Sequence, residues 1–106
     1  MPAAVRQISP EELARLIEAG TIVADVRTPM EREIARIEGA RLLDEEFFDE
    51  LCKLDPATPI AFHCHHGMRS QAAAEHFASL GFTNLYNLAG GIDAWSAEID
   101  PKVPRY

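Results

Sequence analysis

Short apolar runs of strand length alternate with helical patterns along the whole of this chain of 106 residues. Runs typical of strands cover residues 21–26, 40–43, 59–64 and 84–88. This alternation is typical of βαβ units, in which parallel strands are joined by helices. The length fits one domain, and it is enough to bury a hydrophobic core without disulfides or a metal. The sequence therefore predicts a single-domain α/β fold.

Cap and turn residues mark where the predicted helices begin and end. Ser9 and Glu12 form a capping box, Pro10 suits the first turn, and Gly20 can end this helix. Asp44 caps a second helix that runs to Leu54, and a third covers residues 71–80. The pair Gly90-Gly91 opens a final short helix, and the tail of residues 100–106 is expected on the surface. The residues expected to face the core are Leu13, Leu16, Ile17, Phe47, Phe48, Leu51, Leu54, Ala73, Ala74, Phe77, Leu80, Ile92 and Trp95.

The net charge and the cysteine content exclude some classes of partner and indicate the cellular compartment. The net charge of -7, without a basic cluster, argues against nucleic acids and anionic membranes as partners. No apolar run approaches the roughly 20 residues of a membrane span, and residues 1–6 lack the apolar core of a signal peptide. Two cysteines, Cys52 and Cys64, make no disulfide framework, so we expect a cytoplasmic protein. We expect Cys52 to be a small buried hydrophobe.

Cys64 follows the predicted central strand and precedes a helix, which is where open α/β sheets bind ligands. The loop of residues 64–69 contains Gly67 and can turn its backbone N–H groups inward. The helix that follows adds unpaired N–H groups and the positive end of its dipole. Such surroundings lower the pKa of a thiol, and the thiolate is the nucleophile. They would also stabilise a persulfide anion.

The neighbours of the cysteine each allow two interpretations. Arg69 can hold two oxygens of an anion such as a sulfonate, or it can pair with a nearby carboxylate. Ser70 can cap the helix or donate a hydrogen bond toward sulfur. His65 and His66 can raise the local positive potential or simply be solvated. Met68 can form a wall of the pocket or pack elsewhere.

Residues 63–66 are all of metal-ligating types, but we expect neither a metal nor another cofactor. Zinc ligands are typically separated by two or more residues and come from two chain segments. Four consecutive residues cannot easily converge on one tetrahedral ion, and the sequence offers no second cluster.

Three segments together resemble the signatures of the rhodanese family. They are Asp25-Val26-Arg27 with Glu31, Glu33 and Ile37-Glu38-Gly39-Ala40; Cys64-His65-His66-Gly67-Met68-Arg69-Ser70; and Leu88-Ala89-Gly90-Gly91-Ile92-Asp93-Ala94-Trp95. The first segment departs from the family, which usually has Gly-His where this chain has Ala35-Arg36. We expect this segment to be structural, with Asp25 and Arg27 in a buried salt bridge or turn and Glu33 as a candidate partner.

The resemblance implies a rhodanese domain over residues 1–106, with a five-stranded parallel sheet flanked by helices on both faces. It implies that Cys64 accepts sulfur as a persulfide and that residues 65–69 form its cradle. Sulfur would pass from thiosulfate or a related small anion to cyanide or a thiol. The loop and the ending Pro101-Lys102-Val103-Pro104-Arg105-Tyr106 look most like rhodanese domains joined to monothiol glutaredoxins. A glutaredoxin or another thiol protein is therefore a candidate partner.

Two other functions compete with this one. Cysteine phosphatases and arsenate reductases share an anion cradle, but their loop places the arginine six positions after the cysteine. Arg69 lies five positions after Cys64, which gives a tighter ring that suits a single sulfur atom. A non-catalytic docking or regulatory domain is the second alternative, because a fold does not fix a function.

Overall fold

The computed structural model describes residues 4–106 and contains a five-stranded parallel sheet. The order across the sheet is β1-β5-β4-β2-β3, so β4 is central, as predicted. The strands are β1 (Arg6–Ile8), β2 (Ile22–Asp25), β3 (Arg41–Leu42), β4 (Ile60–His63) and β5 (Leu85–Leu88). Strands that follow one another along the chain are joined through helices, which confirms the α/β fold.

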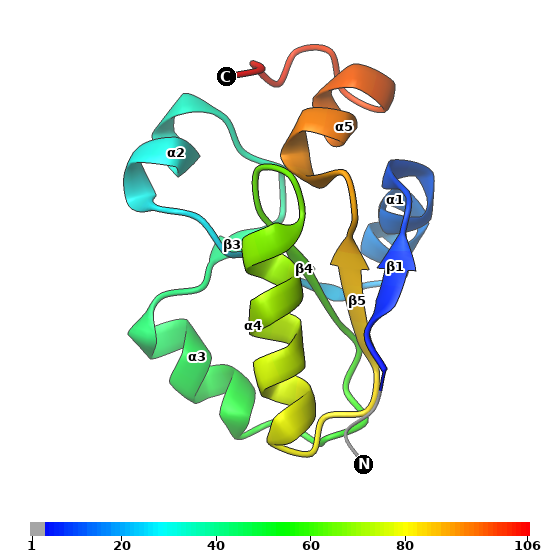
Figure 1. Cartoon of the computed structure of the whole chain (residues 1–106), viewed down its shortest axis with the longest axis vertical. Helices are drawn as coiled ribbons and strands as arrows, with labels where there is room; N and C mark the ends of the chain where they lie inside the picture. The colour runs from blue at the N-terminus through cyan, green and yellow to red at the C-terminus, as the bar shows by residue number, and fades with distance from the viewer. Residues whose placement is uncertain (1–3) are drawn as a thin grey trace.

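Helices cover both faces of the sheet, as Figure 1 shows. One hydrophobic core joins the sheet to α1 and α5, and the other joins it to α3 and α4. The bounds are α1 (Pro10–Glu18), α2 (Pro29–Ile34), α3 (Glu45–Cys52), α4 (Met68–Ser79) and α5 (Gly91–Glu98). The expected arrangement with helices on both faces is confirmed.

Alternation along the inner strands divides the apolar side chains between the two cores. In β2, Val23 packs toward α1 and α5, whereas Ala24 packs toward α3 and α4. In β4, Ala61 joins the first core and Phe62 joins the second. The parallel register pairs Val23 with Ala61 and Ala24 with Phe62, so residues of the same core lie side by side. This double burial explains the continuous apolar runs in the sequence.

The caps at the predicted helix starts are present. Ser9 and Glu12 form the reciprocal capping box of α1, and the Asp44 side chain accepts from the Phe47 N–H at 2.8 Å. Thr28 and Glu31 form a second capping box at α2, a helix that the apolar pattern did not predict. α2 buries none of its residues, so it lacks the stripe on which such predictions depend.

Three side chains expected in the core are exposed. Cys52 is exposed because Phe47 and Leu51, four residues apart, define the buried face of α3, and Cys52 lies a further 100° around the helix. Leu54 follows the end of α3 and is 37% exposed. Leu80 caps the end of α4 and is 48% exposed, while Ala78 takes the buried position on that helix.

None of the helices within residues 4–106 is long and apolar enough to cross a membrane. Residues 1–3, on which the expectation about export partly depends, lie outside the described residues.

Candidate active site

Cys64 lies where the carboxyl ends of β2, β4 and β5 meet at one edge of the sheet (Figure 1). Backbone hydrogen bonds fix its loop from both sides. The Val26 N–H donates to the His63 carbonyl at 2.7 Å, and the Ile92 N–H donates to the Cys64 carbonyl at 2.8 Å. The first amides of α5 thus hold the loop that carries the thiol.

Two glycines allow the loop to lie directly against the connection from β5 to α5. Gly67 has a φ of +100° and Gly91 a φ of +64°, both in the region that favours glycine. A Cβ atom on Gly67 would collide with the Ala89 carbonyl, and one on Gly91 would collide with the His65 carbonyl. The close approach of these backbones therefore requires glycine at both positions.

The sulfur of Cys64 sits among hydrogen-bond donors at the start of α4. The Gly67 N–H donates to Sγ at 3.1 Å and the Ser70 N–H at 3.4 Å. The Ser70 hydroxyl lies 3.3 Å from Sγ. Cys64 is only 1% exposed, so its sulfur lies at the base of the loop. The loop thus turns its N–H groups toward sulfur, in the geometry that the sequence suggested.

Burial and hydrogen bonding act in opposite directions on the Cys64 thiol. Burial raises its pKa, whereas hydrogen bonds from the Ser70 side chain and from the Ser70, Gly67 and His66 backbone lower it. The hydrogen bonds prevail, and the pKa lies below the ordinary value for cysteine. This direction favours the thiolate that nucleophilic chemistry needs.

Ser70 is not the cap of α4. The helix begins at Met68 with Gly67 as its N-cap, three residues before residue 71, where a helix capped by Ser70 would start. Ser70 instead lies buried in the first turn, with its hydroxyl between Cys64 and Asn87. The interpretation of Ser70 as a polar neighbour of the sulfur is therefore the one that fits the structure.

Arg69 forms a two-pronged ion pair with Glu31 of α2. Its Nη1 donates to Oε1 at 2.6 Å and its Nη2 to Oε2 at 2.9 Å. The hydrogen bond from Arg69 is the main reason that the pKa of Glu31 lies well below its usual range. The carboxylate interpretation of Arg69 is thus the observed one, and an anion held by the same guanidinium would have to compete with Glu31.

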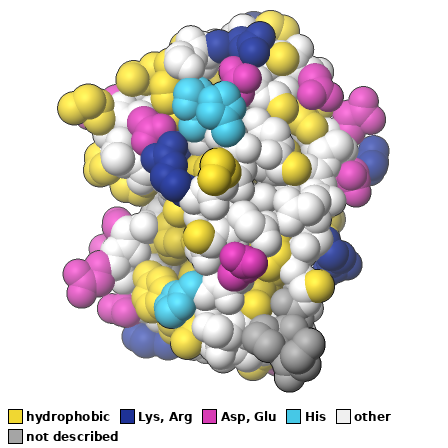
Figure 2. All heavy atoms as spheres, in the orientation of Figure 1, with side chains coloured by type: hydrophobic (Ala, Val, Ile, Leu, Met, Phe, Trp, Pro, Cys, Tyr) yellow, Lys and Arg dark blue, Asp and Glu magenta, His cyan; other side chains and the backbone are white. Residues whose placement is uncertain are grey.

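A stack of three rings covers one side of the loop. His65 lies between His66 and Tyr106, with 4.0 Å between ring centroids on each side. The Tyr106 hydroxyl accepts from Arg27 at 3.0 Å and donates to Glu31 at 2.7 Å. In Figure 2 histidine side chains gather beside basic and acidic ones on this face. The tail is on the surface as predicted, but its last residue reaches the site, which no local pattern signalled.

Met68 stands at the edge of the site and does not pack into the core. It is 84% exposed and borders a hollow of about 390 Å³ that is also lined by His66, Gly67 and Asn87. The interpretation of Met68 as a wall residue fits this position.

Asp25 and Arg27 form the predicted buried salt bridge. Arg27 donates to both carboxylate oxygens of Asp25, at 2.8 and 2.7 Å, and to the Ala35 carbonyl at 2.6 Å. Both side chains are fully buried. The additional partner of Asp25 is Arg32, at 3.4 Å, rather than Glu33, which is exposed. The pair anchors the end of β2 beneath α2.

His63 is fully buried beside this salt bridge, and its pKa is shifted from the ordinary value. Its Nε2 lies 3.9 Å from Asp25, and neither ring nitrogen has a hydrogen-bond partner within residues 4–106. Burial lowers the pKa of His63 to about 4, although the Asp25 charge opposes that shift. The imidazole is therefore neutral at pH 7.

This titration predicts how stability depends on pH. The folded-state pKa of about 4 lies below the ordinary 6.5, so the unfolded chain binds this proton more tightly. The contribution of His63 to the free energy of unfolding is fully present above pH 6.5 and is lost as the pH falls toward 4, about 3 kcal/mol in all. Urea unfolding at several pH values should show a weaker loss in His63→Leu than in the unchanged chain. The exposed control His76→Gln should follow the unchanged chain, and identical curves for all three would contradict the prediction.

The side chains of residues 63–66, all of metal-ligating types, lie in different surroundings. His63 is buried against Asp25, Cys64 faces the amides of α4, and His65 and His66 stack on each other. Within residues 4–106, no group of three or more histidine, cysteine or acidic side chains is placed to hold a metal ion.

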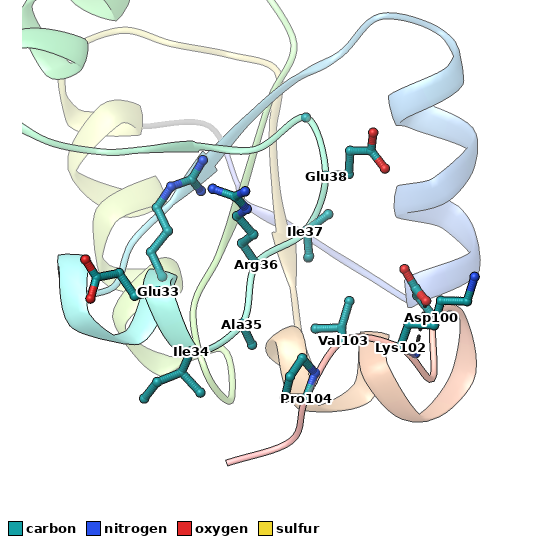
Figure 3. A pocket seen from close by; sticks show the side chains of 12 residues that line it. Glu33, Ile34, Ala35, Arg36, Ile37, Glu38, Asp100, Lys102, Val103 and Pro104 are labelled. Carbon is teal, nitrogen blue, oxygen red and sulfur yellow. Dashed lines mark hydrogen bonds between the residues drawn. The ribbon is translucent and has the colours of Figure 1, made fainter.

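A second and larger hollow, of about 760 Å³, lies away from the thiol. It runs between the segment that follows α2 and the tail, as Figure 3 shows. Glu33, Arg36, Glu38 and Lys102 give it charges of both signs, and no residue of the 64–70 loop lines it. Arg36, the departure noted in the sequence, belongs to this hollow rather than to the sulfur site.

Comparisons with known proteins find several whose sequence or fold is similar to that of this chain. A family model described as Rhodanese-like domain matches residues 9–98. A thiosulfate sulfurtransferase GlpE from Ectopseudomonas mendocina is 36% identical over 93 residues, which are 87% of this chain and 85% of that protein. A rhodanese-related protein from Thermoplasma volcanium has a TM-score of 0.74 at 31% identity, covering 95% of this chain and 99% of that one. The human single-domain sulfurtransferase TSTD1 shares the fold, with a TM-score of 0.75 at 23% identity, covering 90% of this chain and 98% of that one.

Proposed function

Because this chain belongs to the rhodanese-like family and is a sulfurtransferase of the thiosulfate sulfurtransferase type, we propose that it carries sulfur as a persulfide on Cys64. The observation that supports this most is the position of Sγ. It lies among the Gly67 and Ser70 amides at the start of α4, where a negative charge is stabilised. We propose that this sulfurtransferase domain extends over residues 1–106.

The first half of the reaction loads the cysteine. The Cys64 thiolate attacks the outer sulfur of thiosulfate and forms a new S–S bond. The bond between the two sulfurs of thiosulfate breaks, and sulfite leaves with its electron pair. Cys64 then carries a persulfide whose outer sulfur is anionic, and the backbone amides of His66, Gly67 and Ser70 stabilise the negative charge in the loop.

The second half of the reaction transfers the outer sulfur from Cys64 to the acceptor. Cyanide or a thiolate attacks the outer sulfur, the S–S bond to Cys64 breaks, and the electron pair returns to Sγ as a thiolate. The products are thiocyanate or a new persulfide. An exposed thiol of a partner protein is chemically suited to this step, and a glutaredoxin is one such candidate.

Arg69 is the group best suited to hold the oxygens of an anionic donor. Its side chain is about half exposed, and its fork already holds the two oxygens of Glu31. The sulfonate end of thiosulfate offers similar oxygens, so it can replace Glu31 on the same fork. Donor binding in this proposal is an exchange of one anion for another on Arg69.

The intact mass after treatment with thiosulfate tests the proposal directly. We expect the protein to gain the mass of one sulfur atom, and we expect cyanide to remove it with release of thiocyanate. A Cys52→Ser variant should behave identically, since Cys52 lies on the exposed side of α3. Failure of the Cys52→Ser protein to gain sulfur would contradict the proposal.

The same experiment separates the two alternatives. A cysteine phosphatase or arsenate reductase would gain no sulfur and would release phosphate from an aryl phosphate or reduce arsenate. A non-catalytic domain would do none of these. Arg69 lies five positions after Cys64, and the compact cradle around one sulfur atom supports sulfur transfer.

Loss of the arginine fork should affect donor binding more than discharge. We expect Arg69→Ala to raise the KM for thiosulfate by about tenfold or more, the effect of losing charge-assisted hydrogen bonds. Cyanide attack on the preloaded persulfide should slow much less, because the cyanide carries no oxygens for the fork. Separate measurement of loading and discharge checks this, and an equal loss in both steps would contradict it. In the matched variant Glu31→Gln, which weakens the competing ion pair, KM should fall.

A further inference from the structure

The Ser70 hydroxyl lies between two groups that can each accept its proton. Its Oγ is 3.3 Å from the Cys64 sulfur and 2.5 Å from Oδ1 of Asn87, and all three side chains are buried. A hydroxyl has one proton to donate. Ser70 can therefore donate to the sulfur or to Asn87, but not to both at the same time.

The orientation of the Asn87 amide is fixed by its other contacts. Nδ2 donates to the Gly67 carbonyl at 3.1 Å and to Oε1 of Gln7 at 2.9 Å. If the amide were turned over, Oδ1 would face the Gly67 carbonyl, which can only accept hydrogen bonds. Oδ1 must consequently face Ser70, and it needs the Ser70 proton because an unsatisfied buried carbonyl is costly.

We propose that Asn87 is a positioning residue that competes with the Cys64 sulfur for the single proton of Ser70 and thereby sets how readily the thiol ionises. While Cys64 is a thiol, its S–H can donate to Oγ and Ser70 can donate to Asn87. When Cys64 ionises, the thiolate can gain the Ser70 proton only if Asn87 gives it up. Asn87 lies at the end of β5, so this strand tunes a nucleophile that lies beyond β4.

The competition fits the proposed sulfur transfer, on which it depends only for the role of Cys64. In the persulfide, the inner sulfur is bonded to the outer one and no longer carries the charge. The Ser70 proton can then return to Asn87. When the acceptor removes the outer sulfur, the charge reappears on Sγ and the proton can turn back. The hydroxyl would thus follow the charge once in each catalytic cycle.

Several charged or titratable groups also surround the thiol, and they are unchanged by substitutions at Asn87. His63 precedes it on β4, and His65 and His66 follow it in the loop. The others are Asp25 at the end of β2, Arg27 just after it, Arg69 on α4, Glu31 on α2, Asp93 on α5 and Tyr106 in the tail. Gln7 and Gln71, which contact Asn87 or each other, are uncharged amides.

Direct titration of the thiol tests the inference without sulfur transfer. In a Cys52→Ser background, Cys64 is the only thiol, and the change in ultraviolet absorbance against pH, with the same curve for Cys52→Ser/Cys64→Ser subtracted, reports its ionisation. We expect Asn87→Leu, which removes the competing acceptor at similar volume, to lower the pKa of Cys64 by about one unit, the scale of one hydrogen bond. The control Gln7→Leu removes the other side-chain partner of Asn87 and should leave this pKa nearly unchanged. If Asn87→Leu does not fold, Asn87→Ala serves the same purpose.

A second pair of variants separates competition from a general structural effect. In a Ser70→Ala background, Asn87→Leu should not lower the pKa of Cys64, because no proton remains to be shared. An equal shift with and without Ser70 would overturn the inference, as would an unchanged or raised pKa in Asn87→Leu. If the titration behaves as expected but thiosulfate adds no sulfur, the proposed function fails and the inference about Asn87 holds.

Discussion

Replacement of Cys64 by serine is expected to abolish sulfur transfer, with turnover of thiosulfate and cyanide to thiocyanate falling by about a thousandfold or more. A serine hydroxyl in the same cradle keeps its proton at neutral pH, so it cannot take the place of a thiolate. The variant should also show no gain of sulfur mass after thiosulfate treatment. Its fold should be kept, because serine differs from cysteine by one atom and the backbone hydrogen bonds from Val26 and Ile92 that hold the loop do not involve the side chain.

The matched control is Cys52→Ser, which changes the other thiol by the same atom on an exposed helix face. We expect this control to retain full turnover and full sulfur loading. Substantial thiocyanate production by Cys64→Ser, with circular dichroism and thermal unfolding like those of the control, would exclude Cys64 as the sulfur carrier.

Removal of Asp25 is expected to cause the largest loss of stability among the polar substitutions considered. Asp25→Ala leaves the Arg27 guanidinium fully buried without its carboxylate partner. Breaking one side of a buried ion pair typically costs about 3–5 kcal/mol. Arg32 also contacts Asp25, at 3.4 Å, so two cations lose the same counter-charge. The free energy of unfolding from urea denaturation measures this loss.

The control for this prediction is an ion pair of similar length on the surface. Arg41 and Glu50 lie 2.6 Å apart with both side chains about half exposed. We expect Arg41→Ala to cost far less than Asp25→Ala, because water screens exposed charges and solvates the partner that remains. Equal losses of unfolding free energy in the two variants would contradict the prediction that burial makes the Asp25 ion pair more important for stability.

Much of the fold was predictable because its signals are local. The capping box at Ser9, the cap at Asp44 and the continuous apolar run of β4 each depend on residues that are adjacent in sequence. The short strand β1 and the helix α2 were not predicted from pattern. β1 has only three residues and α2 buries none of its own, so neither offers enough periodicity. The fifth strand was expected from the family resemblance alone.

For the site, the sequence by itself determined the cysteine, its place between a strand and a helix, and the glycine that turns the loop. These follow from short-range chemistry, since a loop at a helix start presents its amides whatever lies around it. Only the tertiary structure decided what the polar side chains do. Glu31 occupies Arg69, Tyr106 stacks on His65, and Asn87 faces Ser70. These partners come from segments 17 to 41 residues apart, and the parallel sheet order and the returning tail bring them together, which no local pattern can encode.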